Sequence, residues 1–188
     1  SPDSAIFSNL EYDFDVLCER FREMAYLNRG VSISLESPWH HSRGAEKWKE
    51  AFKYDGGISD FVQGHLNKNK DVLHPVPIHI EKSVDGTLIE AALQYNTGLS
   101  EFIFSFANCI KTPDGGSHLT GLRSALTRAL NDHARKQKLI KDELPNLSGE
   151  DVREGLAAVV SVKLSDPEFE GQTKAKLGNP EVRSQVES

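Results

Sequence analysis

The segment Gly171-Gln-Thr-Lys-Ala-Lys-Leu-Gly178 holds residue types that could bind a phosphate group. Its lysines lie among small and polar residues between two glycines, which is typical of a loop. A lysine on a loop is a mobile point charge, and such a charge suits a phosphate on a neighbouring domain. Many loop lysines are merely solvated, so the segment alone leaves both interpretations open.

A second segment, Gly115-Gly-Ser-His-Leu-Thr-Gly121, leads into a predicted helix. The free amides and the dipole of a helix start could hold an anion there. The segment is not a Walker loop, since no Gly-Lys-Ser/Thr follows it. The spacing by itself favours a turn and a helix cap over an anion site.

Charge is unevenly distributed along the chain. Lys111 to Lys141 contains seven basic and two acidic residues, a local charge of +5, whereas Asp142 to Glu170 contains eight acidic and two basic residues, a local charge of −6. The basic block is either a solvated helix face or a surface that meets a polyanion.

The remaining reactive residues form no evident site. Cys18 and Cys109 stand alone, His40-His41 has no companion ligand, and no Cys or His pair has zinc spacing, so we expect no metal site. The sequence also shows no Ser/His/Asp arrangement and no carboxylate pair set apart for acid–base chemistry. We therefore expect no self-sufficient active site in this chain.

Length and composition set the class of protein. The 188 residues are 38% hydrophobic and 27% charged, with a net charge of −6, which is typical of a globular protein and not of a general nucleic-acid coat. No apolar run reaches the ~20 residues of a membrane span, and Ser1 to Leu10 does not resemble a signal peptide. With two cysteines only, the sequence favours a cytoplasmic location and no membrane partner.

Hydrophobic periodicity predicts the elements that position these segments. Helices are expected at Asp15–Asn28, Ile58–Leu66, His118–Gln137, from Ser148 and from Pro180, and strands at Val31–Leu35, Ala51–Tyr54, Ile78–Ile80, Leu88–Tyr95, Phe102–Ala107 and Leu156–Val162. Turn signals at Val84–Gly86 and Asn96–Gly98 predict two hairpins. The polar stretches Ser37–Gly44 and Asp166–Gly178 read as loops. Strands followed by a long helix indicate an α+β fold.

The longest predicted helix has one apolar stripe. The residues expected to face inward are Leu119, Leu122, Ala125, Leu126, Ala129, Leu130 and His133. Arg128 and Arg135 are expected on the opposite face, with Arg123 at the edge of the stripe.

Motifs spread along the chain in order resemble a known family. The sequence is similar to the transducer domain of the B subunit of bacterial DNA gyrase, a type IIA DNA topoisomerase whose sibling is the B subunit of topoisomerase IV. The similarity is carried by Tyr54–Ile58, Ala91–Asn96, Ser105–Asn108, Asp114–His118, Ala125–Arg128, Glu150–Ala158 and Gly171–Gly178. Ser117, Leu122 and Cys109 are mild departures from the commonest pattern.

The resemblance implies a fold and a domain boundary. The fold would be similar to the second domain of ribosomal protein S5: a mixed sheet with helices on one face and a left-handed βαβ crossover, which the usual right-handed rule would reject. Residues 1–36 would be the C-terminal end of a preceding GHKL-type ATPase domain, and residues 37–188 the transducer domain.

The resemblance also implies roles for site residues. Gln172 and Lys174 would contact the γ-phosphate of ATP, with Lys174 acting as catalytic helper and as sensor of hydrolysis. ATP and Mg²⁺ would be bound mainly by the ATPase domain of the full-length protein, whose base glutamate, Mg²⁺-binding asparagine and glycine-rich lid have no counterpart in this sequence. We therefore expect no bound cofactor and no activity from this chain alone.

Partners follow from the same resemblance. Two transducers in the ATP-closed homodimer would face a cavity that accommodates DNA, and the gyrase A protein would complete an A2B2 assembly. Candidates for facing DNA are Arg123, Arg128, Arg135 and Lys136. Because Arg123 points elsewhere than Arg128 and Arg135, we do not expect all of them on one wall.

Three alternatives remain open at this point. The chain could be the corresponding fragment of topoisomerase IV, which the sequence does not separate from gyrase. It could be a stand-alone S5-like module that binds nucleic acid through Lys111–Lys141, or a purely structural domain. The Gln172-Thr173-Lys174 motif argues against the last two, since a module without a nucleotide partner does not need it.

Overall fold

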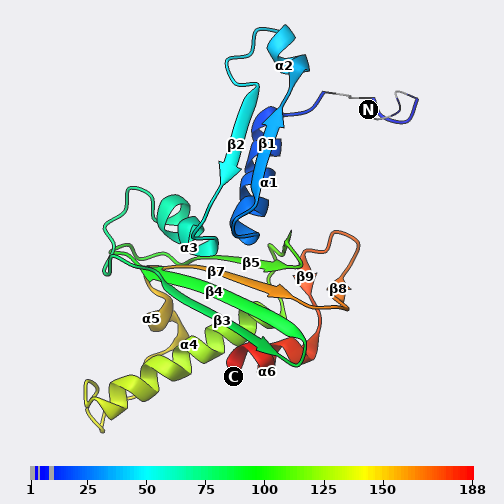
Figure 1. Ribbon diagram of the computed structural model, residues 1–188. Coiled ribbons are helices and arrows are strands. Elements are labelled where there is room, and N and C mark those ends of the chain that lie inside the picture. Colours follow the sequence, from blue (N-terminus) through cyan, green and yellow to red (C-terminus); the bar gives the residue numbers. More distant parts are fainter. Residues whose placement is uncertain (1–2, 4, 9–10) are drawn as a thin grey trace. The chain divides into compact units, whose positions relative to one another are not determined.

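The computed structural model describes residue 3, residues 5–8 and residues 11–188 of the chain (Figure 1). Residues 1, 2, 4, 9 and 10, all in the segment 1–36 expected to belong to an ATPase domain, lie outside the described residues. Backbone contacts divide the chain into two compact units, Ser1–Gly57 and Ile58–Ser188. Each unit has a hydrophobic core of its own.

The first unit packs one helix against a two-stranded hairpin. Its elements are α1 (Phe14–Leu27), β1 (Ser32–Glu36), α2 (Pro38–Ser42) and the antiparallel return strand β2 (Lys49–Lys53). The helix and both strands were predicted from periodicity and are confirmed within a few residues. The expected loop at the tip contains the short helix α2, because Ser37 caps its start and Pro38 fits its first turn.

Cys18 lies in the core of this unit with Phe14 and Phe52. Burial raises the pKa of its thiol to about 11, and a hydrogen bond with Glu50 acts in the same direction. The thiol therefore stays protonated, as expected for a small buried cysteine.

The second unit is built on a five-stranded mixed sheet. The strands are β3 (Ile78–Val84), β4 (Thr87–Tyr95), β5 (Phe102–Ala107), β6 (Ile110–Lys111) and β7 (Leu156–Lys163). Their order in space is β3-β4-β7-β5-β6, with β5 parallel to β7 and the other neighbours antiparallel. β7 is central and buried from Leu156 to Val162, which explains its continuous apolar sequence. The predicted α+β class with a mixed sheet is confirmed.

One of the two predicted hairpins is wrong. β3 and β4 do form a hairpin, with positive φ at Asp85 and Gly86 as a two-residue turn requires. β4 and β5 are not neighbours, because β7 lies between them. A local turn does form, since the Asn96 side chain accepts a hydrogen bond from the Gly98 amide at 2.8 Å. A turn signal reports local backbone geometry, and it does not reveal that a later strand will insert.

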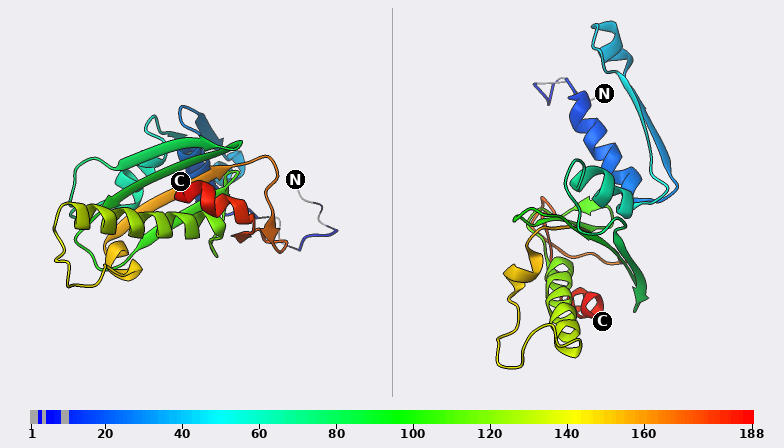
Figure 2. Two further views of the ribbon diagram at one scale, coloured as in Figure 1. Left: turned by 90° about the horizontal axis from the view of Figure 1, so that it is seen from below. Right: turned by 90° about the vertical axis from the view of Figure 1, so that its left-hand side faces the viewer.

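The connection from β5 to β7 crosses the sheet through the long helix α4 (Ser117–Lys136). In Figure 2 (left), α4 lies in front of the sheet. If this view is rotated so that the parallel strands β5 and β7 point upward, β7 lies to the left of β5. The crossover is left-handed, as the resemblance implied and against the usual preference.

Helices cover both faces of this sheet and not one face as the resemblance implied, because the short segment after Gly57 also folds into helical turns against β4 and β7 (Figure 1). α4 and α6 (Pro180–Glu187) pack together on one face. Gly121 permits this close approach, since a Cβ there would lie 2.7 Å from the Arg183 carbonyl oxygen. On the other face, α3 (Ile58–Phe61) and the π-turn η1 (Val62–Leu66) bring the Phe61 ring to 5.6 Å from the ring of Phe104. No helix in the described part of the chain is long and apolar enough to cross a bilayer.

The second half of α4 departs from the predicted stripe. Ala129 and His133 are exposed, whereas Asn131 and Ala134 are buried. The reason is that this half packs against the loop that follows: Asn131 donates to the Leu147 carbonyl at 3.0 Å and accepts from the Leu147 amide at 2.8 Å. The loop ends at α5 (Gly149–Arg153), the helix predicted from Ser148, whose start has a capping box of Ser148 and Asp151.

Candidate functional site

The Gly171–Gly178 segment forms the tip and the second strand of a hairpin and is not an irregular loop. β8 (Phe169–Glu170) pairs with β9 (Lys176–Leu177), with Phe169 opposite Leu177 and Glu170 opposite Lys176. Strands of two residues are too short to show a periodic pattern, so the sequence predicted only a polar, irregular stretch. We call residues 169–177 the Lys174 hairpin.

The two lysines of the Lys174 hairpin have different surroundings. The Lys176 ammonium forms an ion pair with Glu170 at 3.0 Å, so its charge is compensated within the hairpin. Lys174 is exposed, and its Nζ lies 5.8 Å from the centroid of the Phe169 ring. Within the described residues no carboxylate pairs with Lys174. Its ammonium is therefore the charge of this hairpin that an external anion can meet.

The tip presents its polar groups to solvent. Gln172, Thr173 and Lys174 are all exposed, so an amide and an ammonium are displayed side by side. Lys174 adopts a left-handed backbone conformation with φ 56°. A side chain in this region costs on the order of 1 kcal/mol, and such residues concentrate at ligand-binding positions. Chemically, the tip can donate hydrogen bonds and positive charge to a phosphate.

The glycine-rich turn before α4 binds backbone groups of the Lys174 hairpin. The Gly115 carbonyl accepts a hydrogen bond from the Leu177 amide at 3.1 Å, and the Asp114 amide donates to the Ala175 carbonyl at 3.0 Å. Gly116 has φ 135°, and a Cβ there would lie 2.6 Å from the Leu177 nitrogen. The glycines thus hold the second strand of the Lys174 hairpin, and the turn-and-cap interpretation fits the structure better than an anion site.

The basic candidates on and after α4 mostly bind other protein groups. Arg123 forms an ion pair with Glu101. Arg128 donates to the Glu187 carbonyl oxygen at 2.5 Å and lies 4.0 Å from its carboxylate. Arg135 donates to the side chain of Asn146 and to backbone carbonyls of the loop after α4. Lys136 is exposed.

Arg123 and Arg128 line the same shallow groove, whose volume is about 520 Å³. The lining also includes Arg153 of α5 and one acidic residue, Asp132. Arg135 is not part of this lining, because its side chain folds over the following loop. The predicted grouping of Arg128 with Arg135 is therefore wrong for this groove: helical position sets the direction of a Cα–Cβ bond but not where a long side chain ends. We call this lined surface the arginine groove.

Sequence reasoning missed Arg153 and Glu101. The Glu101 carboxylate binds both Arg123 and Arg153, the latter at 2.5 Å from the guanidinium Nε. These residues come from three elements far apart in the chain, so no local spacing could have found them. The shared carboxylate lowers the positive charge that the arginine groove presents.

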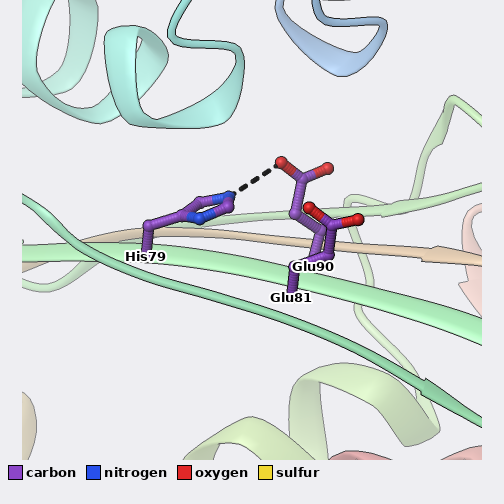
Figure 3. A group of neighbouring side chains, drawn as sticks. All are labelled: His79, Glu81 and Glu90. Atoms are coloured by element: carbon purple, nitrogen blue, oxygen red, sulfur yellow. Dashed lines mark hydrogen bonds and ion pairs between the residues drawn. The ribbon is translucent and has the colours of Figure 1, made fainter.

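A third group of polar side chains lies on β3 and β4 (Figure 3). Metal-ligating atoms of His79, Glu81 and Glu90 lie within 4.8 Å of one another, and the i, i+2 spacing of His79 and Glu81 is a signal that could have drawn attention to them. Glu81 is directly opposite Glu90, and His79 Nε2 lies 3.0 Å from the Glu90 carboxylate. A hydrogen bond between the imidazole and the Glu90 carboxylate therefore accounts for the contact within this group.

Comparisons with known proteins agree on one family. Residues 57–188 match the family model described as DNA gyrase B. The DNA gyrase B protein of Clostridium acetobutylicum is 53% identical over 188 residues, which is 100% of this chain and 28% of that protein. The DNA gyrase B protein of Bacillus mycoides is 49% identical over the same length, 45% of that protein.

A solved structure matches in the same way. The crystal structure of the 43K ATPase domain of Thermus thermophilus gyrase B, in complex with an aminocoumarin, has a TM-score of 0.83 and 38% identity, covering 99% of this chain and 48% of that chain. The chain thus spans less than half the length of each of these relatives.

Proposed function

Because the chain belongs to the DNA gyrase B family, we propose that it is the transducer part of the ATPase subunit of a gyrase. In this proposal residues 1–36 are the end of the preceding ATPase domain and residues 37–188 form the transducer domain. The transducer couples ATP binding and hydrolysis to DNA strand passage and negative supercoiling. Similarity to gyrase B proteins over the whole chain supports the proposal.

The observation that carries the proposal is the exposed tip of the Lys174 hairpin. Lys174 and Gln172 stand in solvent without a carboxylate partner among the described residues, so both can reach an anion outside this chain. In the proposal they contact the γ-phosphate of ATP bound by the ATPase domain. A cation placed there stabilises the charge that develops during phosphoryl transfer. Loss of the γ-phosphate then removes the attraction, and the hairpin is released.

This chain supplies only part of the machinery. ATP and Mg²⁺ are held mainly by the ATPase domain of the full-length cytoplasmic protein, and one or two phosphate contacts do not offset the entropy of binding a nucleotide. The isolated chain should therefore be inactive. The full-length protein works as a homodimer closed by ATP and within an A2B2 assembly with the gyrase A protein.

The arginine groove is the part proposed to face DNA. Arg123 and Arg128 line it, and Arg135 and Lys136 follow in the basic segment Lys111–Lys141. All four are therefore candidates for phosphate contacts. Such contacts give affinity without reading base sequence. That is what strand passage at many different sequences requires.

The test is ATP hydrolysis by the full-length protein carrying Lys174→Ala or Lys176→Ala. Removing the Lys174 ammonium should lower kcat about 100-fold, the typical effect of losing one group that stabilises transition-state charge. Lys176→Ala is the matched control, because it removes an equal charge two residues away that is already paired with Glu170. Equal turnover in Lys174→Ala and the wild type would refute the assignment of Lys174.

A further inference from the structure

A buried chain of hydrogen bonds lies beneath the turn that precedes α4. Ser105 of β5, Thr112 after β6 and His118 in the first turn of α4 are 3%, 2% and 0% exposed. The Ser105 and Thr112 hydroxyl oxygens lie 2.7 Å apart, and the Thr112 hydroxyl oxygen lies 3.1 Å from His118 Nε2. Each hydroxyl also lies 2.9 Å from the carbonyl oxygen of the other residue. The chain of hydrogen bonds therefore ties β5, the turn and α4 together in a buried setting.

The Thr112 hydroxyl is the centre of this chain of hydrogen bonds. It lies within hydrogen-bond distance of both the Ser105 carbonyl and His118 Nε2. Burial lowers the pKa of the imidazole to about 4, so His118 is neutral and its ring can donate or accept one hydrogen bond at Nε2. With either tautomer, the Thr112 hydroxyl connects Ser105 of β5 to His118 of α4.

The turn held by this chain is the attachment point of the Lys174 hairpin. The Gly115 amide donates to the Thr112 carbonyl at 2.8 Å, which closes the turn. The Gly115 carbonyl and the Asp114 amide then bind Leu177 and Ala175 of the hairpin. Leu177 is 1% exposed, so the strand that follows Lys174 is fixed on a rigid base.

The contact between the turn and the hairpin is backbone against backbone. The Cβ of any other residue at Gly116 would lie 2.6 Å from the nitrogen and 2.9 Å from the Cα of Leu177. Backbone cannot rotate away as a side chain can, so the hairpin would have to move. Gly116 thus sets the distance between α4 and the strand that carries the Lys174 tip.

We propose that His118, Thr112 and Gly116 are positioning residues for Lys174. They fix the base of the hairpin so that its tip meets the γ-phosphate at one position, and they contact no nucleotide themselves. The inference rests on the function proposed above for Lys174. It also gives the glycine-rich segment before α4 a role that sequence spacing did not show.

The test is ATP hydrolysis by the full-length protein with Gly116→Ala, with Lys174→Ala and with both substitutions. Gly116→Ala should lower kcat at least about tenfold, with a smaller change in KM for ATP, because displacing a catalytic group by about 1 Å is costly while the nucleotide is held elsewhere. Since Gly116 acts through Lys174, the double variant should be no slower than Lys174→Ala. General damage to the fold would instead multiply with the loss of Lys174.

A matched control separates position from backbone strain. Gly44, between α2 and β2 in the first unit, has φ 76° and no atom within 4 Å of a Cβ built on it. Gly44→Ala therefore also places an alanine at positive φ, without a steric clash and outside the unit that holds the hairpin, and it should keep wild-type kcat. If Gly116→Ala does not fold, Thr112→Val and Thr112→Ser test the same positioning role. The valine removes the hydroxyl and should lower kcat, whereas the serine keeps it and should restore most of the turnover.

Two results would overturn the positioning role. The first is that Gly116→Ala, or Thr112→Val if Gly116→Ala does not fold, keeps wild-type kcat while Lys174→Ala is slow. The other is a double variant that is slower than Lys174→Ala by the full factor seen for Gly116→Ala. Wild-type kcat in Lys174→Ala refutes the proposed function itself, so the two failures are distinguishable.

Discussion

Arg123 on α4 forms an ion pair with Glu101, the residue that precedes β5. The same carboxylate binds Arg153 of α5 at 2.5 Å, so one negative charge holds two guanidinium groups at the edge of the arginine groove. The pairing fixes the direction of both arginines and reduces the positive charge that the groove presents. If the groove faces DNA as proposed, the strength of DNA binding depends on this acidic residue.

Replacing Glu101 with glutamine should therefore strengthen DNA binding by the full-length protein. The substitution frees two guanidinium groups and removes a negative charge from the groove edge, so affinity should rise several-fold and its salt dependence should steepen. The stability cost should stay below about 1 kcal/mol, because the pair is at the surface. Binding measured at several salt concentrations checks this. Glu150→Gln is the control, since it removes an equal charge nearby on α5, and equal effects of the two would contradict the prediction.

Arg128→Gln should weaken DNA binding and lower DNA-stimulated ATPase more than DNA-free ATPase. Loss of one phosphate contact should reduce the slope of log affinity against log salt by about one. Arg128 also binds Glu187, and so does Arg183, whose Nε lies 2.9 Å from the same carboxylate. Arg183→Gln therefore controls for the loss of a positive charge that is paired with Glu187. Comparable losses in the two variants would remove the DNA-facing role of Arg128.

His118 should make the stability of the chain depend on pH in the acid range. Burial lowers its pKa from 6.5 to about 4, so the folded state resists a proton that the unfolded state accepts. Its contribution is complete above pH 6.5 and is lost as the pH falls toward 4, on the order of 3 kcal/mol in all. Denaturant unfolding of the wild type and of His118→Gln measures it. The stability difference between them should shrink from pH 6.5 to pH 4, and a constant difference would show that folding leaves the pKa of the imidazole unchanged.

Gly155→Ala should destabilise the second unit strongly. Gly155 precedes β7 with φ 70°, and a Cβ there would press on the Asn96 carbonyl and lie 2.8 Å from the Gly98 carbonyl oxygen. The steric clash and the backbone strain together should cost at least about 2 kcal/mol. Gly171→Ala has a similar φ of 77° but open space around the new methyl group, so it should cost about 1 kcal/mol. Denaturant unfolding of both variants checks the difference.

The sequence was informative wherever structure depends on neighbours in the chain. The capping box at Ser148, the turn at Asp85-Gly86 and the buried strand from Leu156 follow from local hydrogen bonding and side-chain periodicity, and all three are present. The order of motifs along the chain identified the family and, through it, the left-handed crossover that local rules would have rejected.

Contacts between distant residues were decided only by the tertiary structure. The insertion of β7 between β4 and β5, the pairing of Arg123 with Glu101 and the contact of Gly116 with Leu177 join segments with no common local pattern. Periodicity reports which face of an element is buried, but it does not say which partner covers that face. The sequence thus determined the longer helices and strands, the family and the loop position of Lys174. Only packing decided which turn holds the hairpin of Lys174 and which arginines share a groove.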